Sequence, residues 1–139
     1  MYGSLDVSTS ALTAYRTQLD VIAGNIAMKD AVRRENGEMV PFRRRVPLLA
    51  EGDPRRGANA AGVHVARIVE DATPFGLRWD PDHPHAIQEG DRQGYVRTSN
   101  VDYHTEMVNA MMAARAYEAN VTVMEMTRSM AQSTLRLLA

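Results

Sequence analysis

The sequence of 139 residues contains no cysteine, which excludes disulfide bonds, thiolate metal sites and a cysteine nucleophile. Aromatic residues are also scarce, since one tryptophan and two phenylalanines stand against nine methionines. Methionine is an adaptable filler, common in cores and on helix-binding surfaces. The core must therefore be built from aliphatic side chains, alanine and methionine.

An excess of one charge and long apolar runs are absent as well. The net charge is −1, so no overall field favours nucleic acid or a membrane surface as a partner. No apolar run approaches the ~18 residues of a membrane-spanning helix. The first ten residues, MYGSLDVSTS, contain neither a basic region nor a continuous apolar region. We therefore expect no cleaved secretory signal peptide.

The N-terminal segment, from about residue 6 to 30, has the spacing of an amphipathic helix. Steps of three and four, the a/d pattern of a heptad repeat, connect Leu5, Ser8, Leu12, Tyr15, Leu19, Ile22 and Ile26. Gly24 costs roughly 1 kcal/mol against alanine in mid-helix, but it lets another backbone come close. The spacing predicts one helix with a narrow seam, suited to one main partner.

The C-terminal segment contains neither glycine nor proline from Ser99 onward, and we expect a second, longer helix there. One apolar stripe, broken by Arg128, runs through Met107, Ala110, Ala114, Tyr117, Val121, Met124, Ala131, Leu135 and Leu138. A second line beside it consists of Val108, Met111, Met112, Val123, Met130 and Leu137. This surface is wider than one partner helix covers, which favours packing between subunits. Asp102 and Glu106 are interpreted as exposed first-turn acids that complement the helix dipole.

The middle of the chain, residues 31–98, holds all six prolines and most glycines. The best strand candidate is Gly62–Glu70, and turn signals stand at Asn36-Gly37, Asp53-Pro54 and Asp80-Pro81. We expect a mainly α fold, in which two long terminal helices pack as a coiled-coil-like hairpin around a loop-rich insertion with short β-strands. The expected parts are 1–31, 32–98 and 99–139.

Three motifs in this order resemble those of flagellar basal-body rod and hook proteins. The run from Ser10 to Ala27 is similar to the N-terminal motif of that family, an apolar helix that ends in Asn-x-Ala. The runs 100–109 and 114–120 resemble its C-terminal motif. The runs 80–86 and 94–100 are similar to the proximal-rod members. Together the motifs cover most of the chain.

The resemblance implies a structural subunit of the proximal rod, with no cofactor and no enzymatic activity. Such a subunit would assemble helically through its terminal helices into the torque-transmitting drive shaft. Its partners would be copies of itself and other rod subunits, with the export-gate adaptor and the surrounding ring proteins as further candidates. It would reach the rod in the periplasmic space through the flagellar type III apparatus. The rival is a cytoplasmic helical adaptor that binds partner helices in a methionine-rich groove.

We expect the helical seams to form the subunit interface. The residues concerned are Leu12, Tyr15, Leu19, Ile22, Asn25 and Ile26 in the first helix, and Met107, Met111, Ala114, Arg115, Tyr117, Asn120, Val121 and Met124 in the second. Four of them, Asn25, Arg115, Tyr117 and Asn120, are polar or amphipathic. We interpret these four as residues that set the register between packed helices, as a buried asparagine does in coiled coils.

Two clusters outside the helices can each be interpreted as a functional site or, more plainly, as a turn or loop without a binding role. The run 80–85 contains two aspartates and two histidines, which are metal-ligand types. Its two prolines stiffen the run, no further ligand cluster accompanies it, and a turn with self-capping side chains is favoured. Arg43, Arg44 and Arg45 belong to an arginine-rich stretch that is either a solvated loop or a docking loop for an acidic neighbour. No Gly-x-Ser-x-Gly nucleophile elbow occurs, so no catalytic residue is predicted.

Overall fold

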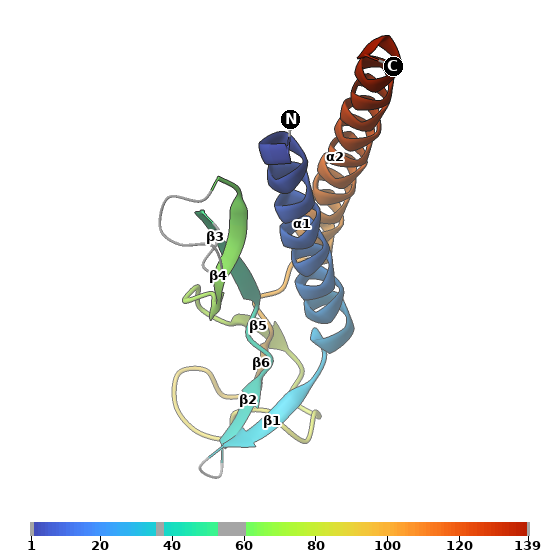
Figure 1. Ribbon diagram of the computed structural model, residues 1–139. Coiled ribbons are helices and arrows are strands. Elements are labelled where there is room, and N and C mark those ends of the chain that lie inside the picture. The colour runs from blue at the N-terminus through green and yellow to red at the C-terminus, as the bar shows by residue number, and fades with distance from the viewer. Residues whose placement is uncertain (1, 36–37, 53–60, 139) are drawn as a thin grey trace.

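The computed structural model describes residues 2–35, 38–52 and 61–138 (Figure 1). The turn signals at Asn36-Gly37 and Asp53-Pro54 lie outside the described residues. In these ranges the elements are, in chain order, one helix, three β-hairpins and a second helix. The two helices lie side by side and run in opposite directions, as Figure 1 shows.

The terminal helices form where the apolar spacing predicts them. Helix α1 spans Tyr2–Met28 and helix α2 spans Tyr103–Leu138, which are 27 and 36 residues long. Asp102 caps the N-terminus of α2. Its carboxylate accepts hydrogen bonds from the backbone N–H of His104 at 3.4 Å and of Thr105 at 3.1 Å. Such a cap satisfies amide groups that have no partner inside the helix. As described, neither helix is long and apolar enough to span a bilayer.

The described strands form antiparallel two-stranded sheets, each made of two strands that are consecutive in the chain. The pairs are β1 (Val32–Glu35) with β2 (Glu38–Pro41), β3 (Arg45–Glu51) with β4 (Val63–Glu70), and β5 (Gly76–Trp79) with β6 (Tyr95–Thr98). The strand predicted at Gly62–Glu70 is confirmed by β4. An isolated two-stranded hairpin is marginal in water, so each hairpin depends on what packs against it.

The hairpins occupy two places in the molecule. The β3–β4 hairpin packs on α1, so α1 has α2 on one side and this hairpin on another. We call α1, α2 and β3–β4 the helical body. The β1–β2 and β5–β6 hairpins contact each other through β2 and β6. We call them the distal hairpins; in Figure 1 they lie below β3–β4.

The predicted mainly α class is wrong, and so is the coiled-coil-like hairpin. Helices α1 and α2 hold less than half of the 139 residues, and six strands form three sheets within the described ranges. Strand β1 could not be predicted from an alternation of apolar and polar residues, because all four of its residues are exposed. The helices do pack together, but α1 also carries β3 and β4. Helix α1 therefore packs against two partners, α2 and the β3–β4 hairpin, and not against one main partner as predicted.

Candidate functional site

One face of α2 is apolar and exposed along most of the helix. It consists of Val108, Met112, Val123, Met126, Met130 and Leu137, which we call the outer stripe. The exposed fractions of these residues lie between 49 and 87%. At 100° per residue the six fall within an arc of about 60°, roughly a third of a turn from the face that contains Glu106 and Ala113. Those two residues are buried. The outer stripe is thus a helix-packing surface without a partner among the described residues.

The predicted interface residues divide between covered and exposed positions. In α1, Ile22 and Asn25 are buried, and Leu12, Tyr15, Leu19 and Ile26 are half-buried. In α2, Ala114, Asn120, Val121 and Met124 are half-buried, whereas Met107, Met111, Arg115 and Tyr117 are exposed. Nothing within a single chain tests contacts between subunits, so the interface role of these residues stays a prediction.

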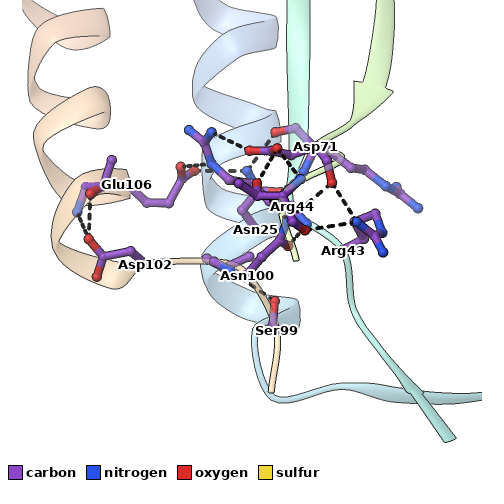
Figure 2. Close-up of polar contacts among 12 residues, drawn as sticks. Asn25, Arg43, Arg44, Asp71, Ser99, Asn100, Asp102 and Glu106 are labelled. Atoms are coloured by element: carbon purple, nitrogen blue, oxygen red, sulfur yellow. Dashed lines mark hydrogen bonds and ion pairs between the residues drawn. The ribbon is translucent and has the colours of Figure 1, made fainter. Parts of the chain in front are cut away.

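A polar cluster lies where the helical body meets the distal hairpins (Figure 2). We call its five residues, Asn25, Arg44, Asp71, Asn100 and Glu106, the junction. Glu106 lies at its centre and is fully buried, with an exposed fraction of 0%. Its Oε1 accepts a hydrogen bond from Arg44 Nε at 2.8 Å, and its Oε2 accepts one from Asn25 Nδ2 at 2.9 Å. Both carboxylate oxygens are therefore satisfied, as a buried charge requires.

Asn25 connects α1 to α2 and to β3. Its amide nitrogen donates to the backbone oxygen of Arg45 at 2.9 Å as well as to Glu106. Its amide oxygen accepts the backbone N–H of Arg45, also at 2.9 Å. The side chain thus bonds the edge of β3 as a neighbouring strand does, and both of its N–H groups have partners.

Arg44 connects the remaining members of the junction. Its Nη1 lies 3.3 Å from Asp71 Oδ2, and its backbone N–H donates to Asn100 Oδ1 at 2.8 Å. The backbone N–H of Asp71 donates to the Arg44 carbonyl oxygen at 2.8 Å. The Asn100 amide in turn donates to the carbonyl oxygens of Asp71 and Thr73, each at 3.3 Å.

The hydrogen bonds of the junction shift the pKa values of two of its members. Burial lowers the pKa of Arg44, but the hydrogen bond and charge of Glu106, followed by those of Asp71, outweigh it and raise the pKa above its usual value. The pKa of Asp71 is lowered, chiefly by hydrogen bonds from the Thr73 hydroxyl and backbone and further by Arg44. At neutral pH both groups are charged, so the junction holds an arginine between two carboxylates.

The expectation of two exposed first-turn acids in α2 is half correct. Asp102 is exposed and caps the helix, whereas Glu106 is buried in the junction. The sequence does hold a signal for this burial, because Glu106 lies seven and fourteen residues before Ala113 and Asn120 on one face of the helix. Its partner Arg44 is 62 residues away in sequence. Spacing within one helix therefore gives no indication of the ion pair.

The three neighbouring arginines differ in their surroundings. Arg44 belongs to the junction. Arg43 donates to the carbonyl oxygens of Asp71 and Thr73 at 2.9 and 3.1 Å, and its guanidinium lies 4.3 Å from the Phe75 ring centre. Arg45 is exposed, with its guanidinium 5.5 Å from the Phe42 ring centre. A docking role for these arginines stays a prediction.

The aspartates and histidines of the run 80–85 lie in successive turns, as the plainer interpretation predicts. The backbone N–H of His83 donates to the Asp80 carbonyl oxygen at 3.3 Å. The backbone N–H of His85 donates to the Nδ1 of His83 at 3.1 Å. Within the described ranges, no three histidine or acidic side chains gather in a way that suits a metal ion.

The exposed apolar stripe on the longer terminal helix is the kind of surface that marks a protein which assembles with others. The comparisons identify the assembly. Residues 92–137 match the family described as flagellar basal body rod FlgEFG protein C-terminal. The chain is 40% identical to the flagellar basal-body rod protein FlgC of Bacillus subtilis, over 98% of this chain and 97% of the relative. The FlgC of Borreliella burgdorferi is 37% identical over 99% and 97%. The FlgC of Salmonella typhimurium is 38% identical over 95% of this chain and 93% of the relative.

These relatives are flagellar basal-body rod proteins and are similar to the chain over nearly its full length. The chain belongs to the FlgC family of flagellar basal-body rod proteins. It is therefore a structural rod protein and not an enzyme, and the resemblance seen in the sequence is confirmed. The rod protein is favoured over the rival adaptor.

Proposed function

We propose that this chain is a proximal-rod subunit that assembles helically with copies of itself and with other rod proteins. The rod would transmit torque through contacts between terminal helices. The subunit would reach the rod through the flagellar type III apparatus without cleavage of a signal peptide. The observation that carries the assembly step is the outer stripe of α2, together with membership in the FlgC family.

The energetics of the outer stripe support assembly between subunits. Fully burying a methionine, valine or leucine side chain contributes about 1.5–3 kcal/mol. Six such side chains in one arc form an apolar surface of the kind that marks interaction sites on proteins. The hydrophobic core is small by comparison, since the buried apolar residues of the described chain are Ala11, Ala14, Ile22, Ala86, Val96, Val101 and Ala113. A neighbouring helix on the outer stripe would supply burial that the isolated chain lacks.

The exposed residues of the predicted interface extend this surface. Met107 and Met111 are 40 and 57% exposed, and they lie near the start of α2, about 60–100° around the helix from the edge of the outer stripe. The half-buried residues of α1 would contribute where α1 and α2 present a common edge. The six predicted α1 residues would thus act mainly by positioning α2, and the α2 residues by direct contact with a neighbour.

Charged substitutions in the outer stripe test the proposal. We expect the pair Met126→Glu and Met130→Glu to abolish rod incorporation, because two carboxylates cannot be buried in an apolar contact without partners. The measurement is motility of a strain whose own copy of the gene is deleted, together with detection of the chain in purified basal bodies. Wild-type chain must restore both.

The control for this test lies on the same helix. Ser129 and Gln132 are exposed and fall outside the arc of the outer stripe, and Ser129 lies about 27 Å along α2 from Met111, which is on the same face. The pair Ser129→Glu and Gln132→Glu adds the same two charges there, and we expect it to leave incorporation intact. Normal motility of the Met126→Glu and Met130→Glu variant would contradict an assembly role for the outer stripe. Failure of the wild-type chain itself would contradict the rod function.

A further inference from the structure

The distal hairpins are joined to the helical body without helix–strand packing. Among the described elements, α1 packs on α2, β3 and β4, whereas no strand of β1–β2 or β5–β6 packs on either helix. The chain passes between the two parts at residues 29–31, 42–44, 71–75 and 99–102. The direction of the distal hairpins therefore depends on these four linkers and on what binds them.

The junction takes one residue from each of three linkers. Arg44 comes from the linker before β3, Asp71 from the one after β4, and Asn100 from the one before α2. The other two members, Asn25 and Glu106, belong to the helices. Figure 2 shows the labelled side chains of all five converging between the two helices and the strands. A rotation of the distal hairpins about the helical body would have to change the backbone of these linkers, which the side chains of Arg44, Asp71 and Asn100 hold in place.

The geometry of the junction specifies one arrangement. Glu106 accepts from Arg44 Nε at 2.8 Å and from Asn25 Nδ2 at 2.9 Å, with one carboxylate oxygen for each donor. Hydrogen bonds weaken steeply when their angles change, whereas apolar side chains tolerate sliding. An ion pair whose buried carboxylate is bonded at both oxygens is therefore suited to fixing an angle.

Stability alone gives a weak reason for burying this ion pair. Desolvation of two charges offsets most of their attraction, and apolar residues of similar volume often serve as well or better. We propose that the Arg44–Glu106 pair, held by Asn25, is an orientation lock. It sets the angle of the distal hairpins to the helical body, and rod assembly depends on that angle. This inference rests on the proposed rod function.

The double variant Arg44→Met and Glu106→Leu separates orientation from stability. Arg44→Met leaves the buried Glu106 carboxylate without its ion-pair partner, and Glu106→Leu leaves the half-buried Arg44 with Asp71 alone, so we expect the thermal midpoint to fall in both single variants. The double variant removes both charges and keeps similar volume, and only the Asn25 N–H loses its acceptor, so we expect its midpoint to lie above those of both single variants. It should nevertheless fail to restore motility to the deletion strain, because its distal hairpins no longer keep one angle.

The angle itself is measurable in the purified full-length chain. Because the protein has no cysteine, Arg16→Cys on α1 and Glu89→Cys between β5 and β6 place two spin labels at exposed positions outside the junction. We expect a narrow distance distribution between the labels in the otherwise wild-type chain. In the Arg44→Met and Glu106→Leu background we expect a broad one.

An exposed ion pair serves as the control. Arg33 and Glu35 form a 2.9 Å pair within β1, with 73 and 52% of their side chains exposed. This ion pair does not connect β1 to another element. The matched double change Arg33→Met and Glu35→Leu should keep both the narrow distribution and motility.

Four outcomes would overturn the lock. They are a broad distribution in the wild-type background, a narrow one in the junction double variant, normal motility of that variant, or a midpoint as low as in the single variants. The last would mean that the pair serves stability. If the wild-type chain does not restore motility, the proposed rod function fails and not the lock.

Discussion

Asn25 offers a single-atom test at the residue scale. Its amide nitrogen donates to the Arg45 carbonyl oxygen and to Glu106, each at 2.9 Å. In Asn25→Asp an acceptor replaces that donor, and a second carboxylate faces Glu106. Buried polar groups that lose their partners cost more than a hydrogen bond contributes. We therefore expect a larger effect than the near-identical shape of the two side chains suggests.

We predict that Asn25→Asp lowers the free energy of unfolding by about 2–4 kcal/mol. The measurement is urea unfolding followed by circular dichroism at neutral pH. Asn109→Asp is the control, because Asn109 is half-buried in α2 and makes no side-chain hydrogen bond to a described residue. It should change the free energy of unfolding by no more than about 0.5 kcal/mol. Equal effects of the two changes would contradict the account of the junction.

Two aspartates give stability a dependence on pH. Hydrogen bonds from Thr73 lower the pKa of Asp71, and hydrogen bonds from Thr105 lower that of Asp102. A carboxyl group with a lower pKa in the folded than in the unfolded state binds protons less readily when folded. Its contribution to stability is complete above the ordinary pKa of 3.8, and is lost as pH falls through the lowered value.

We accordingly predict that the urea midpoint is steady between pH 7 and about 5 as far as these two groups contribute, and falls below about pH 4. The variants Thr73→Val and Thr105→Val remove the leading hydrogen bonds and should make the fall shallower. Ser133→Ala, at an exposed position elsewhere in α2, should leave its steepness unchanged. An unaltered fall in both threonine variants would show that other groups cause it.

At the element scale, two glycines should respond in opposite directions to the same substitution. Gly24 lies in α1 with nothing within 4 Å of an added Cβ. Gly62 precedes β4 with a φ of +139°, and an added Cβ would lie 2.7 Å from the Ser10 hydroxyl oxygen. That hydroxyl accepts the backbone N–H of Val63 at 3.0 Å and so ties β4 to α1.

We predict that Gly24→Ala stabilises the isolated chain by about 0.5–1 kcal/mol. Gly62→Ala should destabilise it by about 1–3 kcal/mol, because strain and the clash with Ser10 weaken the contact of β4 with α1. Urea unfolding measures both, and hydrogen exchange at the Val63 amide should speed up in Gly62→Ala alone. Stabilisation by Gly62→Ala would refute the described contact between hairpin and helix.

Some elements can be predicted from the sequence and others cannot, for physical reasons. Both helices and β4 follow from apolar periodicity, a local property of the chain. The distal strands do not, because exposed strands such as β1 carry no alternating pattern. The face of α2 that is buried within the chain does not follow the apolar stripes, because it contains the charged Glu106, whereas Met107 beside it is exposed. A charged residue on a buried face is understood only once Arg44 is seen beside it.

At the scale of the whole molecule, the family could be inferred from three motifs, but not the geometry that serves it. Motif order indicated a rod protein, and the relatives confirm it. The outer stripe was visible in part as a second apolar line, although its exposure depends on which face of α2 meets α1. The junction joins residues up to 81 positions apart, a separation at which sequence spacing carries no information.

The central claim is that α2 packs against neighbouring subunits in the rod through the outer stripe. Since the chain contains no cysteine, Met126→Cys places a single thiol in that stripe, at a residue that is 61% exposed in the isolated chain. The decisive measurement is its labelling by a maleimide in intact basal bodies from motile cells, compared with the same basal bodies after denaturation and with the free subunit. The account predicts rapid labelling of the free subunit and of denatured basal bodies, and protection in intact ones. Equally rapid labelling in intact basal bodies would contradict it.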